Sequence, residues 1–508
     1  MKLSDLVKAI KPMSVEHTGA DKNIDPQIAS IHYRSQEVTA GGLFVAIPGR
    51  AADGHDFIED AIERGAVAIV SQKQIGSPIP NIQVADSRLA LAELAACFYG
   101  NPSEHLTLIG ITGTNGKTTT AYLVESILQQ AGLAVGVIGT INYRYAGNAF
   151  NNPITTPESL DLQRILSDMR RSGVSHVVME ASSHAIDLQR IRRCWFDVAV
   201  FINLSQDHLD FHGDMQSYWL SKQRFFTDYL VEGPKRAKAV AVINCNNASG
   251  KELAQKLSVP VFTTGWGPDE TVRALNAVCG PGGIEGELET PGGKFDFKSR
   301  LVGEHNLENI LCATGVGAAL DISIADVKSG IEAVSTIPGR LECIENKIGR
   351  YVYVDYAHTP DALENVIMAL KAVIKEKMIC VFGCGGDRDR EKRPLMGEIA
   401  ARLCDLAVIT SDNPRTEDPM DIIDHIIAGA QKAGGRRYKP ADLSNGFKHS
   451  GFVVEADRRQ AIRLGIAVSK PGDTVLIAGK GHETYQIIGT TTKAFDDREE
   501  AKKALAEL

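Results

Sequence analysis

The sequence lacks any apolar run that approaches the length of a membrane-spanning helix. Its first residues, MKLSDLVKAIKPMS, carry charges inside the apolar stretch, which is not typical of a secretory signal. The composition, 44% hydrophobic and 23% charged residues in a chain of 508, is that of a soluble globular protein. We therefore expect a cytoplasmic protein that does not act at a membrane.

The sequence also lacks an excess of positive charge, and it lacks cysteine pairs of the CxxC type. Lysine and arginine number 55 against 63 aspartates and glutamates, which gives a formal net charge of −8. A general nucleic-acid-binding surface is therefore not expected, and any anion must bind at a local site. The nine cysteines are scattered and form no CxxC pair, so we expect reduced thiols buried in the core.

What the sequence does have is a regular alternation of strand-like and helix-like segments, which predicts α/β layers. A chain of this length is too long for a single core. The alternation breaks near residues 98–105 and again near 335–340. We therefore predict three α/β domains, at residues 1–103, 104–336 and 337–508.

The middle of the chain is expected to contain two kinds of sheet. Apolar runs at 106–111, 135–140, 174–180 and 197–203 are typical of buried parallel strands. Residues 270–302 instead show alternating stretches separated by glycine pairs. This pattern predicts a small antiparallel sheet attached to the middle domain.

The stretch ITGTNGKTTT (111–120) follows an apolar strand and opens a helical segment. Glycines let backbone amides turn toward an anion, and the helix N-terminus adds a favourable dipole. In such loops a lysine, here Lys117, reaches the β- and γ-phosphates, and the next hydroxyl, here Thr118, binds Mg²⁺. The strict P-loop pattern would need glycine at Ile111, so a glycine-rich turn without a ligand stays an alternative.

The form TGTNGKT resembles the Mur ligase family, the ATP-dependent amide ligases of peptidoglycan synthesis, whose relatives include folylpolyglutamate synthase. Further matches run along almost the full chain: EASSHA (180–185), NLSQDHLDFH (203–212), YWLSK (218–222), GEHNLENI (303–310), IPGRLE (337–342), VDYAHTPDAL (354–363), GCGGDRDREKRPLM (383–396), SDNPR (411–415) and AGKGHE (478–483).

The resemblance implies an N-terminal UDP-sugar-binding domain, a central P-loop ATPase-like domain and a C-terminal Rossmann-like domain that binds an amino acid. It implies ATP as co-substrate, Mg²⁺ as cofactor, small-molecule substrates, no nucleic acid or membrane partner, and a monomer. The ATP-binding residues it implies are Gly113, Thr114, Asn115, Gly116, Lys117, Thr118, Thr119, Asn306 and Arg340. Asp355 is expected to contact ribose or a Mg²⁺-bound water, or to cap a strand end.

The transfer of a phosphoryl group to a carboxylate brings anions together and needs cations between them. The resemblance makes Lys117, Glu180, His208 and Lys222 catalytic, and gives Mg²⁺ the ligands Thr118, Glu180, His208 and Lys222. Asp207 and His212 are expected to support this site. Without the resemblance, the cluster QDHLDFHGD (206–214) is equally typical of a solvated loop.

Lys222 lies among aromatic residues in YWLSKQRFF, where a lysine is usually a surface residue with a buried stem. The Mur ligases carry a carbamylated lysine at this place, so the resemblance implies N6-carboxylysine at Lys222. A desolvated, neutral amine can take up CO₂. The resulting anion would face Mg²⁺.

The UDP-muramoyl dipeptide would be bound by Ser35, Thr155, Thr156, Ser182 and Arg190, which align with the contacts of the family. Hydroxyls and an arginine suit diphosphate and carboxylate groups. Residues 34–36, Ile154 and Leu188 depart from the family pattern, and ordinary caps and surface polar residues stay an alternative for each contact.

SDNPR (411–415) follows the apolar run DLAVIT and, taken alone, is typical of a strand-to-helix turn. GCGGDRD, DNPR and GKGHE together are typical of the family members that add meso-diaminopimelate. A fixed arginine can bind the distal carboxylate of this amino acid, which lysine does not have. The resemblance implies a diaminopimelate site formed by Arg388, Asp412, Asn413, Pro414, Arg415, Gly479 and Glu483, in which Asp412 and Asn413 contact amines or orient the loop.

The expected activity is the ATP-dependent addition of meso-2,6-diaminopimelate to the D-Glu γ-carboxylate of UDP-MurNAc-L-Ala-D-Glu through an acyl phosphate. Two alternatives stay open. One is another ligase of the superfamily, adding lysine here or glutamate to folate. The other is a non-enzymatic nucleotide switch, which would need no amino-acid pocket.

Overall fold

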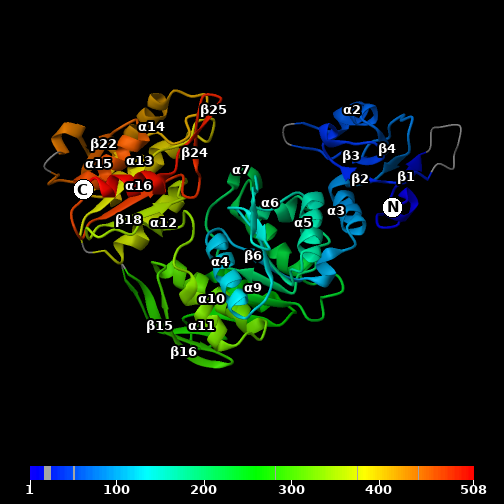
Figure 1. Ribbon diagram of the computed structural model, residues 1–508, viewed down its shortest axis with the longest axis horizontal. Coiled ribbons are helices and arrows are strands. Elements are labelled where there is room, and N and C mark those ends of the chain that lie inside the picture. The colour runs from blue at the N-terminus through cyan, green and yellow to red at the C-terminus, as the bar shows by residue number, and fades with distance from the viewer. Residues whose placement is uncertain (17–24, 50–51, 281, 375, 444–445) are drawn as a thin grey trace. The chain divides into compact units, whose positions relative to one another are not determined.

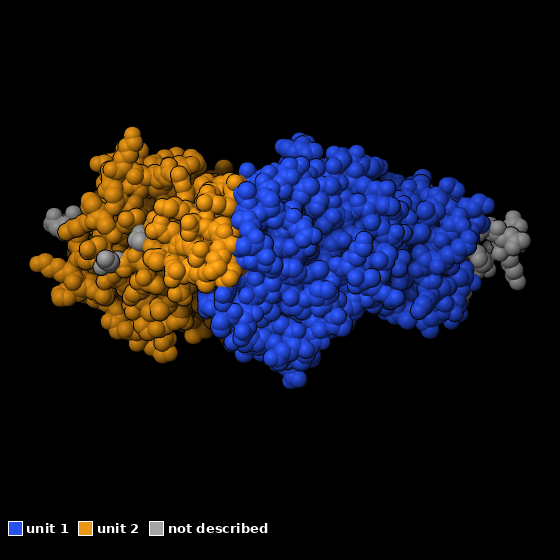
Figure 2. All heavy atoms as spheres, turned by 90° about the horizontal axis from the view of Figure 1, so that it is seen from below, with its two compact units in different colours: residues 1–273, 290–293, 311–327 blue, residues 274–289, 294–310, 328–508 orange. Residues whose placement is uncertain are grey.

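The structure is a computed structural model that describes residues 1–16, 25–49, 52–280, 282–374, 376–443 and 446–508. The chain divides into two compact units, coloured separately in Figure 2. Unit 1 comprises residues 1–273, 290–293 and 311–327, and unit 2 comprises residues 274–289, 294–310 and 328–508. Among the described residues, no helix is both long and apolar enough to cross a bilayer.

The N-terminal part of unit 1 is a five-stranded sheet of order β1-β5-β4-β3-β2, with β1 antiparallel and the other strands parallel. Leu43 packs with α3, whereas the next residue, Phe44, packs with α2, because successive side chains of a strand face opposite sides. The elements are α1 (Leu3–Val7), β1 (Ser14–Glu16), β2 (Ser30–His32), η1 (Ser35–Glu37), β3 (Gly42–Val45), η2 (Gly54–Phe57), α2 (Ile58–Glu63), β4 (Ala66–Ser71), β5 (Asn81–Gln83), α3 (Ser87–Phe98) and η3 (Pro102–His105).

The rest of unit 1 contains a mainly parallel sheet, of which β6 is labelled in Figure 1. Its order β13-β12-β11-β6-β10-β7 is followed by a hairpin, β8 and β9. The carboxyl ends of β6 and β10 are neighbours in this sheet, so the residues that follow β6 lie beside Glu180. The elements are β6 (Thr107–Thr112), α4 (Lys117–Gln130), β7 (Val135–Ile138), β8 (Tyr143–Tyr145), β9 (Asn148–Phe150), α5 (Ser159–Arg171), β10 (His176–Glu180), α6 (Ser183–Asp187), β11 (Val198–Phe201), α7 (Leu209–His212), α8 (Met215–Arg224), the π-helix η4 (Phe225–Tyr229), β12 (Val240–Asn244), α9 (Ala248–Lys256) and β13 (Val261–Gly265).

The segment predicted to form a small antiparallel sheet is folded as three consecutive strands, in the order β14-β15-β16, and the first residues of β14 pair in parallel with β13. They are β14 (Val272–Gly280), β15 (Gly283–Thr290) and β16 (Gly293–Ser299), and two helices follow, α10 (Glu304–Ala319) and α11 (Ile324–Ala333).

Unit 2 contains a sheet of order β17-β18-β23-β19-β20-β22-β21, parallel except for β17. Alternate strand residues pack with α12, α13 and α14 on one face and with α15 and α16 on the other. The elements are β17 (Glu342–Cys343), β18 (Tyr351–Asp355), α12 (Pro360–Lys371), β19 (Met378–Phe382), α13 (Lys392–Leu403), β20 (Leu406–Ile409), α14 (Pro419–Lys432), β21 (Arg436–Tyr438), η5 (Pro440–Leu443), β22 (Gly451–Val454), α15 (Arg458–Val468), β23 (Thr474–Ala478), the hairpin β24 (Tyr485–Ile488) and β25 (Thr491–Ala494), and α16 (Asp497–Ala506).

The strand order of unit 2 places three connecting loops together. β23, β19 and β20 are consecutive parallel neighbours, so the loops that follow them leave the same edge of the sheet side by side. These loops carry GCGGDRD, SDNPR and GKGHE, which are far apart in the sequence.

The predicted α/β class is confirmed by these sheets. The predicted domain boundaries at 103 and 336 stay a prediction. The expectation that every cysteine is a core thiol is wrong in part. All nine are free, but Cys343 is exposed and Cys97 and Cys279 are only half-buried. Cys343 lies on the two-residue strand β17, which is the edge strand of its sheet among the described residues.

Candidate active site

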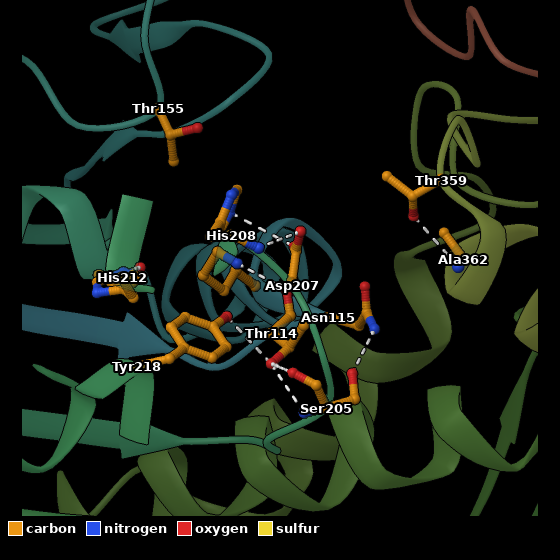
Figure 3. Close-up of polar contacts among 12 residues, drawn as sticks. Thr114, Asn115, Thr155, Ser205, Asp207, His208, His212, Tyr218, Thr359 and Ala362 are labelled. Atoms are coloured by element: carbon orange, nitrogen blue, oxygen red, sulfur yellow. Dashed lines mark hydrogen bonds and ion pairs between the residues drawn. The ribbon is translucent and has the colours of Figure 1, made fainter. Parts of the chain in front are cut away.

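The nucleotide loop, residues 113–119, joins β6 to α4 and is fixed by the segment 203–205. The Thr114 hydroxyl donates to the carbonyl oxygen of Ser205 at 3.1 Å and lies 3.1 Å from the Tyr218 hydroxyl (Figure 3). The Asn203 side chain accepts the backbone N–H groups of Thr114 and Asn115. Gly116 caps α4 with a φ of 85°, a conformation that favours glycine.

Lys117 lies back over this loop, and its ammonium donates to the carbonyl oxygens of Gly113 and Thr114 at 2.9 Å each. Thr118 and Thr119 follow in the first turn of α4 and are buried. The strand, loop and helix predicted from the sequence are therefore present, and the Lys117 ammonium lies at the N-terminus of α4.

Lys222 is 1% exposed, so the interpretation as a surface lysine is wrong. It is on α8, and its Nζ donates to the Gly113 carbonyl oxygen at 2.9 Å and lies 4.4 Å from the centre of the Tyr218 ring. Burial, and then the nearby Lys117 charge, lower the pKa of Lys222 well below its usual value. The lowered pKa favours the neutral form of this amine, which lies against the nucleotide loop.

Glu180 ends β10 and is buried. Its two carboxylate oxygens accept hydrogen bonds from Thr140, one from the backbone N–H at 3.0 Å and one from the hydroxyl at 2.8 Å. Each carboxylate oxygen keeps a further lone pair, so the group can still bind a cation.

His208 precedes α7 with a φ of 55°, a strained conformation for a residue other than glycine. Its Nε2 lies 3.4 Å from Asp207. In the part of the chain that the structure describes, no three His, Cys, Asp or Glu side chains are grouped to hold a metal ion. Of the four ligands expected for Mg²⁺, only Glu180 and His208 are of these types.

His212 is held by a different set of residues from His208. Its Nε2 is 2.9 Å from the Ser183 hydroxyl and its Nδ1 is 3.2 Å from Asp187. These contacts link α7 to both ends of α6. His212 therefore fixes α6, which begins directly after Ser182.

Four of the five residues expected to bind the dipeptide gather around Glu180. The Thr156 hydroxyl donates to the Glu180 carbonyl oxygen at 2.7 Å and to the Ser182 hydroxyl at 3.3 Å. Thr155 lies 3.1 Å from the Thr140 hydroxyl, and Arg190 donates to the Thr156 carbonyl oxygen. Ser35 lies in the N-terminal sheet region, buried at the start of η1.

The loops after β20 and β23 carry the cluster that is called the amino-acid pocket below, because most of its members are predicted to bind the amino acid: Asp412, Asn413, Arg415, Gly479, Lys480 and Glu483. The Asn413 amide nitrogen donates to Glu483 at 3.0 Å, and its amide oxygen accepts from Lys480 and from the Ile487 backbone N–H. Asn413 therefore orients the loop, one of the two roles left open by the sequence. Gly479 has a φ of 120°, and a Cβ there would lie 2.6 Å from Asp412 Oδ2.

The pKa values of the two carboxylates in this pocket are shifted in opposite directions. Burial alone would raise the pKa of Asp412, but Lys480 and Arg458 reverse this effect and the net pKa is lowered. For Glu483, burial is the largest effect, and the pKa is raised although Lys480 opposes it.

Arg415 has a φ of 51° and is held in this conformation by β24 and by the loop that follows β19. Its backbone N–H donates to the Ile487 carbonyl oxygen at 3.1 Å, and its Nη1 donates to the Gly386 carbonyl oxygen at 2.7 Å. The backbone N–H of Gly386 donates in turn to the Asn413 carbonyl oxygen, next to the buried Pro414. Arg388, on the same loop as Gly386, is exposed.

The other residues expected to bind ATP lie in unit 2. Asn306 donates to the Val302 carbonyl oxygen at 2.8 Å and accepts from Asn309 at 3.0 Å, so both asparagines share one face of α10 as predicted. The Arg340 guanidinium lies 5.1 Å from the centre of the Tyr356 ring. Both carboxylate oxygens of Asp355 accept backbone N–H groups, from Leu341 and Ala357, which is the strand-end cap that the sequence allowed.

Comparison with known proteins assigns the family. Residues 111–317 match the Mur ligase middle domain, residues 339–481 the glutamate ligase domain of Mur ligases, and residues 27–99 the catalytic domain of the Mur ligase family. The UDP-N-acetylmuramoyl-L-alanyl-D-glutamate–2,6-diaminopimelate ligase of Geobacter metallireducens is 48% identical over 510 residues, covering 100% of this chain and 99% of the relative. The chain belongs to the Mur ligase family. The protein of the same name from Geobacillus thermodenitrificans is 41% identical, with 100% of both chains covered.

Solved structures place the fold of this Mur ligase in the same family. A structure of a UDP-N-acetylmuramoyl-L-alanyl-D-glutamate–2,6-diaminopimelate ligase matches with a TM-score of 0.69 and 30% identity, covering 100% of this chain and 99% of the other. The MurF ligase from Thermotoga maritima in complex with ADP matches with a TM-score of 0.61 and 21% identity, over 94% and 97% of the chains, and is similar in fold alone. The predicted three-domain α/β architecture is confirmed.

Two buried cations of this Mur ligase were not anticipated from the sequence. Lys480 is at the centre of the amino-acid pocket, and Arg393 binds Glu417 through two hydrogen bonds at 2.8 and 3.1 Å. Glu417 also accepts the backbone N–H of Asp387, so this pair joins the loops that carry Arg388 and Arg415. The available signal was position, because Lys480 directly follows a buried strand and stands between two glycines.

Proposed function

We propose that this Mur ligase uses ATP to join meso-2,6-diaminopimelate to the D-Glu γ-carboxylate of UDP-MurNAc-L-Ala-D-Glu. The observation that carries the choice of amino acid is the amino-acid pocket, which combines the guanidinium of Arg415 with the carboxylates of Asp412 and Glu483. The distal end of diaminopimelate has an amine and a carboxylate, so it offers a partner to both charges. Lysine would leave the guanidinium without an anion.

The nucleotide loop provides the groups that bind the phosphates of ATP. Its backbone amides stand at the N-terminus of α4, where an anion is favoured, and Lys117 can leave the two carbonyl oxygens that it now contacts to reach a phosphate. The substrate carboxylate attacks the γ-phosphorus, the bond to ADP breaks, and an acyl phosphate forms. We further assign Asn306 to the adenine and Arg340 to the phosphates.

The residues around Glu180 fit a Mg²⁺ ion, since a buried carboxylate and the Thr118 hydroxyl are hard oxygen ligands of the kind that this ion prefers. Bound Mg²⁺ supplies positive charge to the phosphate oxygens. His208 and Lys222 are assigned to the same site. Lys222 offers no anion as an amine, but its burial lowers its pKa and so favours the neutral form, which is the form that CO₂ carbamylates.

The dipeptide end of the nucleotide substrate is assigned to Thr155, Thr156, Ser182 and Arg190, with Ser35 on the sugar-nucleotide side. These residues are linked to Glu180 by the Thr156 hydroxyl and by Thr140. The amine of diaminopimelate then attacks the carbonyl carbon of the acyl phosphate and loses its proton. Nearby cations stabilise the negative charge of the tetrahedral intermediate. This intermediate then expels phosphate and leaves the neutral amide.

The test is phosphate release from MgATP with UDP-MurNAc-L-Ala-D-Glu, measured in parallel with meso-diaminopimelate and with L-lysine. We expect release that depends on both the nucleotide substrate and diaminopimelate. Equal or better release with lysine would keep the ligase activity and overturn the assignment of Arg415. Release with neither amino acid would favour a folate ligase or a nucleotide switch.

Three further assignments accompany this function. We assign the protein to the cytoplasm, because its proposed substrates are small soluble molecules, and we propose the monomeric state that the family resemblance implies. We also assign the domain boundaries to residues 103 and 336. Cell fractionation, light scattering after size-exclusion chromatography, and mapping of sites of limited proteolysis test these three points in turn.

A further inference from the structure

Lys480 is a fully buried lysine at the centre of the amino-acid pocket. Its Nζ donates to the Asn413 amide oxygen at 2.8 Å and to the Tyr485 carbonyl oxygen at 2.7 Å. Two carboxylates lie close to it, Asp412 at 3.3 Å and Glu483 at 3.6 Å. The side chain has 0% exposure, so a substrate in the pocket does not reach it without displacing these partners.

The contacts of Lys480 join three segments that are separate in the sequence. Asp412 and Asn413 follow β20, Glu483 follows β23, and Tyr485 begins β24. A buried ammonium is unfavourable unless its three donors are engaged, so the position of each segment is coupled to the other two. Lys480 is therefore a structural centre of the pocket as well as a charge within it.

The amide of Asn413 transmits this effect to Glu483. Its oxygen accepts from Lys480 and from the Ile487 backbone N–H, which fixes the orientation of the amide. The nitrogen consequently points at Glu483 and donates to its Oε2 at 3.0 Å. Removing the Lys480 ammonium takes away one of the two contacts that define this orientation.

We propose that Lys480 is a positioning residue that fits the amino-acid pocket to the distal ammonium group of its substrate, by holding Glu483 in place through Asn413 and by placing a positive charge beside it. This inference rests on the proposed function, in which Glu483 receives that ammonium. Lys480 itself does not touch the amino acid. Arg415 remains the partner of the distal carboxylate.

The charges around Glu483 explain why an ammonium is needed there. Burial and the neighbouring Asp412 raise the pKa of Glu483, whereas Lys480 lowers it. The other charged or titratable groups that face Glu483 are Arg458, Tyr356 and Tyr485. Arg458 is already bound to Asp497 through two hydrogen bonds at 2.8 and 2.7 Å. Lys480 is thus a cation 3.6 Å from Glu483, and without it Glu483 would take up a proton at a higher pH.

The experiment compares wild type, Lys480→Met and Lys480→Arg in phosphate-release assays across pH 6 to 9. For Lys480→Met we expect KM for meso-diaminopimelate to rise about 30-fold or more at neutral pH, with KM for ATP unchanged. We also expect the acid limb of kcat/KM for diaminopimelate to move to higher pH by about one pH unit. Lys480→Arg keeps the charge and should keep the acid limb of the wild type.

Two controls separate positioning from a general loss of structure. Lys432→Met removes an exposed lysine of unit 2 that pairs with Glu398, and should change neither constant. In a Glu483→Gln background, adding Lys480→Met should cost much less than it does in wild type, because the charge that Lys480 acts on is absent. If Lys480→Met does not fold by circular dichroism, Lys480→Gln replaces it in every arm.

The outcomes distinguish this inference from the proposed function. Wild type that does not turn over diaminopimelate overturns both. Normal wild-type turnover, with an unchanged KM and acid limb in Lys480→Met, overturns the role of Lys480 alone. Effects of Lys480→Met and Glu483→Gln that simply multiply would also overturn it, because they would show that the two residues act independently.

Discussion

The nucleotide loop and the amino-acid pocket are built in opposite ways. The nucleotide loop is one continuous stretch whose useful groups are backbone amides at the start of α4, fixed by the short segment 203–205. The amino-acid pocket is assembled from side chains on separate loops, joined by the buried ammonium of Lys480. A site made of backbone groups can be recognised in one continuous sequence motif. A site made of side chains from several loops depends on which strands are neighbours in the sheet.

This difference has a functional consequence for a ligase of this kind. Every ATP-dependent ligase needs the same phosphate groups bound, and backbone amides serve that purpose whatever side chains surround them. The amino acid must be distinguished from similar ones, and discrimination requires polar side chains that are left without partners by the wrong substrate. Changes in the nucleotide loop should therefore affect turnover, and changes in the pocket should affect the choice of substrate.

The largest effect is expected from Lys117→Met. This change removes the ammonium that lies across the nucleotide loop, and kcat should fall by about three orders of magnitude because transition-state charge loses a partner. Phosphate release measures it. Lys256→Met, which removes an exposed lysine of unit 1, is the control. A loss of less than tenfold would contradict the assignment of Lys117 to the phosphates.

Lys222→Ala should lower kcat by roughly two to three orders of magnitude, because the buried group against the Gly113 carbonyl oxygen is lost. If Lys222 acts as a carbamate, small carboxylic acids such as acetate should restore part of the activity by entering the space that the side chain leaves. Mass spectrometry under CO₂ would detect the adduct directly. Full activity of the alanine variant would rule out any role for Lys222.

Arg415→Lys tests the pocket by substrate choice. A lysine cannot form the two parallel hydrogen bonds that a guanidinium makes with a carboxylate, so kcat/KM for meso-diaminopimelate should fall about a hundredfold while KM for ATP stays unchanged. The ratio of kcat/KM for meso-diaminopimelate to kcat/KM for L-lysine should fall correspondingly. Arg402→Lys, at an exposed ion pair with Glu364, is the matched control. A uniform loss with both amino acids would place Arg415 outside the recognition of the carboxylate.

The smallest effect is expected from Gly479→Ala. The added Cβ would lie 2.6 Å from Asp412 Oδ2 at a φ of 120°, so Asp412 must shift and kcat/KM for diaminopimelate should fall about tenfold. Gly434→Ala provides the comparison, because Gly434 also has a positive φ, of 77°, but nothing lies within 4 Å of its Cβ. Equal kinetic effects of the two variants would show that backbone strain alone, and not Asp412, is responsible.

The sequence predicted much of the candidate site because its motifs are local. The strand, loop and helix around Lys117 follow from glycines between an apolar run and a helical segment, and the structure contains them. The position of Lys222 could not be predicted in this way. An amphipathic lysine among aromatic residues suits a surface as well as a core, and its burial depends on how α8 packs against the loop after β6.

The same reasoning explains the cations that were missed. Lys480 stands in a motif in which the glycine and the glutamate were the predicted contacts, but its own partner Asn413 is 67 residues away and its partner Tyr485 is on the next strand. Arg393 likewise binds Glu417 on another loop. Cys343 was assigned to the core because cysteines usually are buried, but its place on an edge strand leaves it exposed.

The sequence by itself determined the α/β class, the glycine-containing turn before α4 and the chemical types of the residues, because periodicity, glycine placement and charge are properties of short segments. Tertiary structure decided which of these residues meet. Parallel pairing of β23, β19 and β20 brings three distant loops to one edge, and the packing among them places Lys480 3.6 Å from Glu483. The physical reason is that burial and strand order, which set the pKa of a side chain and its neighbours, are properties of the packed chain.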